Sequence, residues 1–385
     1  MKLAFQLAYK NLVGAGLRTW LNVGVLAFSF IIILFYNGLI DGWDEQARRD
    51  TIAWEYGHGQ LLHEKYDPYD PFTLDDGHGP LSKEQRKNLV PILIRQAAIY
   101  PQGRMFSVML KGVQSDQTTL ELPTDAFGES DAALPIIMGS QMADAAKLKE
   151  GDEVTLRWRD KHGTFDAAAV TVVKVFKTNV PTVDNGQIWM PIEKLWEMTG
   201  LTDHATLCVA NEAFESKEVA GWTFAAQESL LKTLNDIIAT KKASGSIMYL
   251  LLLAIALLAI FDTQVLSVFR RQKEIGTYIA LGMTRTQVVG LFTVEGSMYS
   301  VFAMVIGCVF GIPFLSYLAH TGIPMHSGSQ DMGIAVAERI FPVFGLQLIV
   351  GTVLLVVISA TIVSFLPARK IAKMNPVDAL KGKLV

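Results

Sequence analysis

Four apolar stretches, each long enough to cross a lipid bilayer, constrain this chain more than any other feature. They run over residues 21–40, 247–269, 290–318 and 341–366. A helix needs about 20 apolar residues to cross the hydrocarbon core, and its backbone polar groups must be satisfied within the segment. The sequence therefore predicts a multi-pass membrane protein with four transmembrane helices.

Charge is distributed unevenly along the chain. Residues 41–246 contain 31 acidic and 21 basic side chains, whereas the rest of the chain contains 6 acidic and 13 basic ones. The basic excess lies in residues 1–20, 270–289 and 367–385. Since basic flanks stay in the cytoplasm, we expect both termini and the turn 270–289 inside. Residues 41–246 and the short loop 319–340 are then expected outside, in the periplasm.

The first apolar stretch is predicted to stay in the mature protein. It is too long for a signal peptide, and Gly38–Trp43 contains no A-x-A-like cleavage site. The preceding residues 1–20 place Leu3, Leu7 and Leu12 among polar residues and contain no acid. This pattern favours an amphipathic helix at the membrane surface, and a basic flank that only sets orientation is the alternative.

The turn between the second and third stretches, RRQKEIGTYIALGMTRTQV (Arg270–Val288), has a helical pattern. Apolar residues recur at helical spacing, at Ile275, Ile279 and Met283. Gly282 is a natural helix stop, and Thr284 with Gln287 fits the capping box that starts a new helix. A short amphipathic cytoplasmic helix is predicted, with a merely topogenic basic loop as the alternative.

Residues 41–246 are long enough for one or two folded domains and have a mixed α+β texture. Residues 154–158 and 169–176 flank Asp160–Gly163, which predicts a hairpin. From Gln227 onward, apolar residues trace one helical face that leads toward the second span. The predicted fold class is an α+β membrane protein with a large extracytoplasmic domain inserted between the first and second of four transmembrane helices.

Several residues within or beside the spans need an explanation. Asp262 and Glu295 lie inside spans, where a bare charge costs several kcal/mol, so both are expected to face other helices or a polar cavity. The alternative is a snorkelling or neutralised carboxyl. Gly307 and Gly311 form a small-xxx-small face suited to close helix contact. Gly245 and the following serine mark either a hinge or an ordinary helix break.

No motif for catalysis or metal binding is found. Cys208 and Cys308 are expected in different environments, so no disulfide is predicted. No Cys/His spacing fits zinc, and four aspartates that interleave with prolines do not match a calcium loop: Asp67, Asp70, Asp75 and Asp76. No P-loop, GxSxG or HExxH motif is present. We therefore expect neither an enzyme nor a bound cofactor or metal.

The motifs EIG…ALG…TR in the turn resemble the cytoplasmic signature of the FtsX-like permease family of ATP-binding cassette (ABC) transporters. Further landmarks follow in the family's order: Asn11-Leu12, Arg18-Thr19, Glu295-Gly296 and Pro367–Leu380. Two central segments, Gly139–Trp158 and Val172–Pro191, look closest to the lipoprotein-releasing branch. The turn after Arg157 is shorter than the hook of some relatives, and Ile279 stands where many carry a basic residue.

The resemblance implies a permease in the bacterial inner membrane that works by mechanotransmission and releases lipoproteins. A separate ATPase, which binds ATP and Mg, would dock on eight residues of the turn: Lys273, Glu274, Ile275, Gly276, Leu281, Gly282, Thr284 and Arg285. The other implied partners are a second permease chain, identical or paralogous, a lipoprotein or other hydrophobic client, and membrane lipid. The acidic external region disfavours nucleic acid.

Three alternatives remain at this stage. The cargo could be a macrolide, another drug, a peptide or a toxin. The chain could instead be a signalling subunit that activates a cell-wall hydrolase, although such relatives tend to have a smaller external domain. A membrane enzyme such as an acyltransferase would need a nucleophile near the membrane, and none is found.

Overall fold

The computed structural model describes residues 16–215, 219–325, 337 and 339–373, which form two compact units. The helical unit comprises residues 1–42, 238–323 and 341–385, and the sheet unit comprises residues 43–237 and 324–340. Most of the expected surface helix 1–20 and of the basic tail 367–385 lies outside the described residues.

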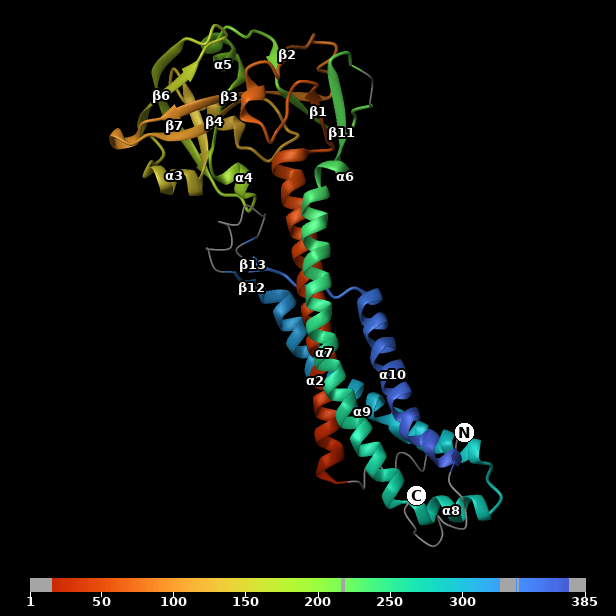
Figure 1. Cartoon of the computed structure of the whole chain (residues 1–385). Coiled ribbons are helices and arrows are strands. Elements are labelled where there is room, and N and C mark those ends of the chain that lie inside the picture. The colour runs from red at the N-terminus through yellow and green to blue at the C-terminus, as the bar shows by residue number, and fades with distance from the viewer. Residues whose placement is uncertain (1–15, 216–218, 326–336, 338, 374–385) are drawn as a thin grey trace. The chain divides into compact units, whose positions relative to one another are not determined.

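Within the described residues, four helices are long and apolar enough to cross a membrane, as the sequence predicts. They are α2 (Leu17–Thr51), α7 (Lys232–Arg270), α9 (Arg285–Thr321) and α10 (Leu346–Ala368) (Figure 1). Three of them extend beyond the expected span at both ends. The fourth begins later than expected: Gly345 is its extended N-cap, and the Val343 N–H donates to the Gly38 carbonyl instead.

Helices α2 and α7 are in direct contact within the helical unit. The Asn22 amide donates to the Thr263 hydroxyl at 2.6 Å, and the Tyr36 hydroxyl donates to a carbonyl of α7 at 3.0 Å. A Cβ on Gly245 would overlap the Tyr36 ring. The expectation of a helix break at Gly245 is wrong, because α7 is continuous there, whereas the hinge stays a prediction. Glycine at this position allows close packing instead.

Glycines of α9 also lie against neighbouring helices. A Cβ on Gly296 would overlap Ser364 of α10, and one on Gly307 would press on Phe30 of α2. Gly311 faces Ile31 of α2. The small-residue face therefore lies against another helix of the same chain.

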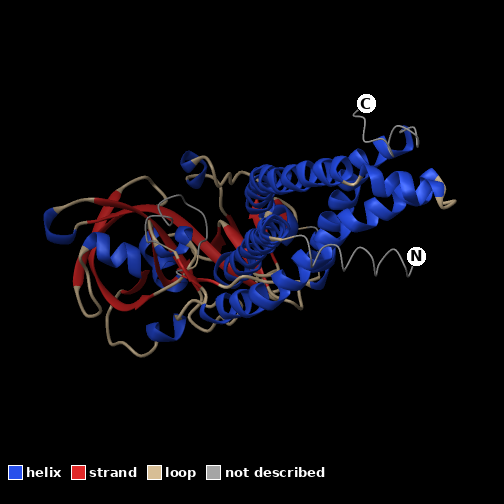
Figure 2. Cartoon of the chain, turned by 90° about the horizontal axis from the view of Figure 1, so that it is seen from below, coloured by secondary structure: helices blue, strands red, loops and turns tan. Residues whose placement is uncertain are grey.

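The main sheet of the sheet unit has nine strands in the order β11-β1-β10-β3-β4-β8-β5-β7-β6, and β3 also pairs with β6. This extra pairing closes six strands into a small barrel, drawn in red in Figure 2. The nine strands are β1 (Gly59–His63), β3 (Leu89–Ile99), β4 (Phe106–Val113), β5 (Pro135–Gly139), β6 (Glu153–Arg159), β7 (Phe165–Phe176), β8 (Gln187–Pro191), β10 (Leu207–Ala210) and β11 (Trp222–Ala226).

Shorter elements complete the described chain. Two-residue strands pair as β2 with β9 and β12 with β13: β2 (Gly79–Pro80), β9 (His204–Ala205), β12 (Ile323–Pro324) and β13 (Arg339–Ile340). The short helices are η1 (Ile52–Tyr56), η2 (Pro71–Leu74), η3 (Pro101–Gly103), η4 (Thr124–Phe127), α3 (Ser140–Ala146), α4 (Pro181–Asp184), α5 (Ile192–Thr199), α6 (Gln227–Leu230), α8 (Gln272–Ala280) and η6 (Arg369–Lys373).

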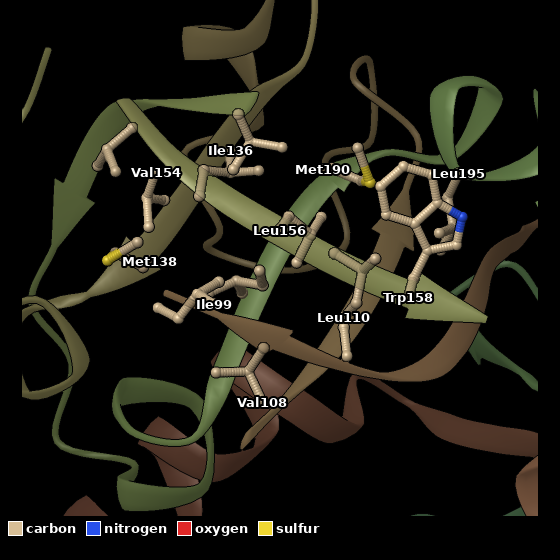
Figure 3. Close-up of a cluster of buried hydrophobic side chains, with 14 of the residues drawn as sticks. Ile99, Val108, Leu110, Ile136, Met138, Val154, Leu156, Trp158, Met190 and Leu195 are labelled. Carbon is tan, nitrogen blue, oxygen red and sulfur yellow. The ribbon is translucent and has the colours of Figure 1, made fainter. Parts of the chain in front are cut away.

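The barrel interior is filled by alternate residues of its strands, as Figure 3 shows. On β6, Val154, Leu156 and Trp158 are buried while the residues between them are exposed, which is the period of a half-buried strand. The predicted hairpin is confirmed, since β6 and β7 pair antiparallel across a turn in which the Asp160 carboxylate accepts from the Thr164 N–H at 2.8 Å. The α+β class of this region is therefore correct.

Candidate functional site

The turn between α7 and α9 contains the short helix α8 (Gln272–Ala280). Gly282 has φ +98°, a conformation that glycine adopts without strain. The Gly282 N–H donates to the Ile279 carbonyl, and the Met283 N–H donates to the Tyr278 carbonyl. These two bonds are a Schellman motif, so glycine ends α8 as the sequence predicts.

The start of α9 is capped by its own side chains. The Thr284 hydroxyl accepts from the Gln287 N–H at 3.3 Å, and the Gln287 side chain accepts from the Thr284 N–H at 2.9 Å. The predicted capping box is therefore present. Two adjacent stop and start signals hold α8 as a separate helix between two long ones.

One face of α8 packs on a small apolar core shared with α7, α9, α10 and η6. Ile275 is fully buried there, together with six other residues: Val268, Val288, Val289, Phe292, Ala368 and Ile371. Gly276 is buried as well. Ile275 and Gly276 thus pack within the chain's own core, and their predicted role in ATPase coupling stays a prediction.

The opposite face of the turn is open to solvent. It contains six of the eight residues predicted for coupling: Lys273, Glu274, Leu281, Gly282, Thr284 and Arg285. Leu281 has 78% of its surface exposed although it is a large apolar residue. An exposed apolar side chain among charges is a common form of protein docking surface. We call these six residues the α8 surface.

Arg271, which the sequence analysis treated only as a basic flank, fixes this turn to α9. Its Nη1 donates to both carboxylate oxygens of Glu295 at 2.9 Å, and its Nε donates to Glu274 at 2.7 Å. The guanidinium also lies over the Phe292 ring, 4.8 Å from its centre. Glu295 is thus explained by an ion pair, and the spacing of 24 residues hid its partner.

Asp262 does not share this environment. Its side chain is exposed on α7, and its placement against other helices or a polar cavity stays a prediction. By contrast, the polar side chain of Gln264, two residues further along α7, is buried in the helical unit. No group of three or more metal-ligating side chains occurs among the described residues, and Cys208 and Cys308 are both free thiols.

Comparison with known proteins finds one family model that is similar to the C-terminal part of the chain. Residues 246–376 match the model described as FtsX-like permease C-terminal. This range includes α8, the α8 surface, and most of α7. The match supports the FtsX-like permease family of ABC transporters and a multi-pass membrane protein.

Three curated relatives carry permease names. An uncharacterized ABC transporter permease of Methanocaldococcus jannaschii is 27% identical over 40% of this chain and 37% of its own length. The macrolide export ATP-binding/permease protein MacB of Marinobacter nauticus is 28% identical over 43% and 23%, respectively. The ABC transporter permease YtrF of Bacillus subtilis is 30% identical over 34% and 30%. The matches therefore span no more than 37% of these relatives' lengths.

One solved structure is also similar in part. The extracellular domain of the noncanonic ABC-type transporter YknZ from Gram-positive bacteria aligns with 40% of this chain and 83% of its own chain, at 15% identity and a TM-score of 0.24. A likeness this weak carries no conclusion about fold or function.

Proposed function

We propose that this chain is the permease subunit of an ABC transporter, with the sheet unit outside the cell membrane and the α8 surface in the cytoplasm. The match of residues 246–376 to the FtsX-like permease family carries this proposal. The four apolar helices and the segregation of charge support it. In a bacterium this membrane is the inner membrane, and both termini are cytoplasmic.

In this proposal a separate ATPase, which holds ATP and Mg, binds the α8 surface. Leu281 supplies the apolar anchor, while Lys273, Glu274 and Arg285 set its charge pattern. The Arg271–Glu295 ion pair and the apolar core under Ile275 make α8 rigid relative to α9. A displacement of α8 is therefore transmitted to the long helices, because the turn between them does not deform.

The transmission of this movement uses α7, which is one uninterrupted helix from Lys232 to Arg270. At about 1.5 Å per residue its 39 residues span about 60 Å, more than the hydrocarbon core requires. Two permease chains, identical or paralogous, then work as a pair, and Asp262 takes part in the helix contacts that change. Unchanged transport by Asp262→Asn over a wide pH range would remove Asp262 from this mechanism.

The proposed client is a lipoprotein or another hydrophobic molecule that leaves the outer leaflet of the membrane. Export of a macrolide is the second candidate, because the Marinobacter nauticus relative is named a macrolide export ATP-binding/permease protein. Activation of a cell-wall hydrolase without transport is the third.

The test is purification of the tagged full chain from native membranes in mild detergent, followed by mass spectrometry. An ABC ATPase together with acylated lipoproteins is the expected result. The ATPase with a wall hydrolase would replace transport by signalling, and the ATPase with export of an added macrolide would favour the second candidate. A preparation without any ATPase would contradict the proposal as a whole.

A further inference from the structure

The sheet unit displays two aromatic rings that do not join its core. Tyr69 and Phe72 each have 87% of their surface exposed, in a run of six consecutive exposed residues, 67–72. Most large apolar side chains of this unit lie in its buried cores. Two highly exposed aromatic rings so close in the sequence are unfavourable in water and typical of contact surfaces.

The loop that carries the two rings is ordered by its own hydrogen bonds. The Asp67 carboxylate accepts from the Tyr69 N–H at 2.9 Å, and the Asp70 carboxylate accepts from the Phe72 N–H at 3.0 Å. The Thr73 hydroxyl accepts from the Asp67 N–H and donates to the Asp70 carbonyl at 2.7 Å. The backbone under each ring is therefore fixed before any partner arrives, which lowers the entropy lost on binding.

Buried groups of the sheet unit anchor the returning limb of this loop. Arg95, which is only 5% exposed, donates to the Leu74 carbonyl at 2.8 Å and lies 3.6 Å from the Asp75 carboxylate. One ring nitrogen of His78 lies 2.9 Å from a ring nitrogen of His204. The loop is thus fixed to the sheet at its base, while its aromatic side stays in solvent.

The charge around the rings is negative. Residues 64–78 contain five carboxylates and one ammonium group: Glu64, Asp67, Asp70, Asp75, Asp76 and Lys65. An anionic rim repels phosphate surfaces such as nucleic acid and acidic lipid headgroups. The complementary surface is an apolar cleft bordered by lysine or arginine side chains, since aromatic anchors fill pockets and opposite charges steer and orient the encounter.

We propose that residues 64–78 form a protein-docking loop, in which Tyr69 and Phe72 insert into the apolar cleft of a different protein with a cationic rim. This partner lies on the same side of the membrane as the sheet unit. The proposal goes beyond the permease function and requires neither the ATPase nor the transported client.

The experiment places the photocrosslinking residue p-benzoylphenylalanine at Phe72, or at Tyr69, in the full chain in its native membrane. Phe165 is the matched control position, because it is a half-exposed aromatic residue elsewhere in the sheet unit. Light should produce an adduct with the same single protein from both loop positions and not from Phe165. Tandem mass spectrometry should locate the crosslink in a partner peptide with apolar residues beside lysine or arginine.

A charge-reversal variant tests the electrostatic half of the proposal without removing the loop's hydrogen bonds. Glu64→Lys with Asp76→Lys changes two exposed carboxylates whose side chains make none of the bonds described above. The adduct yield should fall about tenfold, and added salt should lower the wild-type yield in the same direction. Unchanged melting of the variant shows that the fold is intact.

Each other outcome overturns the proposal. If neither loop position forms an adduct, the two rings are exposed to solvent and bind no partner. An adduct with lipid would assign the loop to the membrane surface, and one with a second copy of this chain would make it a self-association site. An adduct that forms equally from Phe165, or that ignores the charge reversal, would show contact without the proposed recognition.

Discussion

The ion pair between Arg271 and Glu295 gives the sharpest prediction of stability. Glu295 has 10% of its side chain exposed, and Arg271 has 19%. Removing one partner of a buried pair leaves an uncompensated charge, which typically costs about 3–5 kcal/mol. Arg271 contacts two carboxylates, Glu295 at 2.9 Å and Glu274 at 2.7 Å, so it keeps a carboxylate partner when Glu295 is neutralised.

This inequality predicts an order of effects. Arg271→Gln should lower the free energy of unfolding by about 3 kcal/mol or more, since it leaves the buried carboxylate without its ion pair. Glu295→Gln should cost less, about 1–2 kcal/mol, because Glu274 still partly compensates the arginine. Glu274→Gln should cost about 0.5 kcal/mol, since this carboxylate is half-exposed and solvent screens it.

The assay is reversible unfolding of the full chain in mixed micelles of increasing denaturing detergent, read by tryptophan fluorescence. A double variant, Arg271→Gln with Glu295→Gln, should be more stable than the sum of the single effects predicts, because neither charge is then left unpaired. The reasoning fails if Arg271→Gln is no more destabilising than Glu274→Gln, or if the double variant is strictly additive.

Two further perturbations test the packing of α7 and the histidine pair. Gly245→Ala should cost about 1–3 kcal/mol in the same assay, because its Cβ would overlap the Tyr36 ring, whereas Gly290→Ala on open α9 surface should stabilise by up to about 1 kcal/mol. Equal effects of the two alanines would refute the packing argument. Burial, with nearby Arg95 and His204 adding to it, lowers the pKa of His78 from 6.5 to about 4. The folded state then binds fewer protons than the unfolded chain between these pH values, so stability should fall as pH drops from 6.5 to 4 and level off below, by at most about 3 kcal/mol. His78→Gln should flatten this pH dependence, and an unchanged slope would contradict it.

The sequence was sufficient to predict those elements whose formation depends only on residues close together in the chain. The four apolar stretches predict four long helices because backbone groups in a bilayer must bond within their own segment. Gly282 and the Thr284–Gln287 pair predict the end of α8 and the start of α9, since stop and cap need only neighbouring residues. The β6–β7 hairpin was equally local.

Contacts between residues far apart in the sequence could not be predicted. Nothing in the spacing of Arg271 and Glu295 shows that a helical turn brings them together. Glycine weakens an isolated helix, so a break at Gly245 was expected, but α7 continues through this residue and packs closely against Tyr36 there. The pattern around Ile275 predicts an amphipathic helix without showing what covers its apolar face, which in the structure is the chain's own core.

The most direct test of the central claim measures how much ATPase binds per permease chain after purification from native membranes. We predict that Leu281→Asp lowers this ratio at least about tenfold, because ATPase binding would then bury a carboxylate in place of the exposed apolar anchor of the α8 surface. Phe165→Asp, which changes an exposed aromatic residue of the sheet unit, should leave the ratio unchanged. Equal ATPase binding by Leu281→Asp and the unaltered chain would contradict the account.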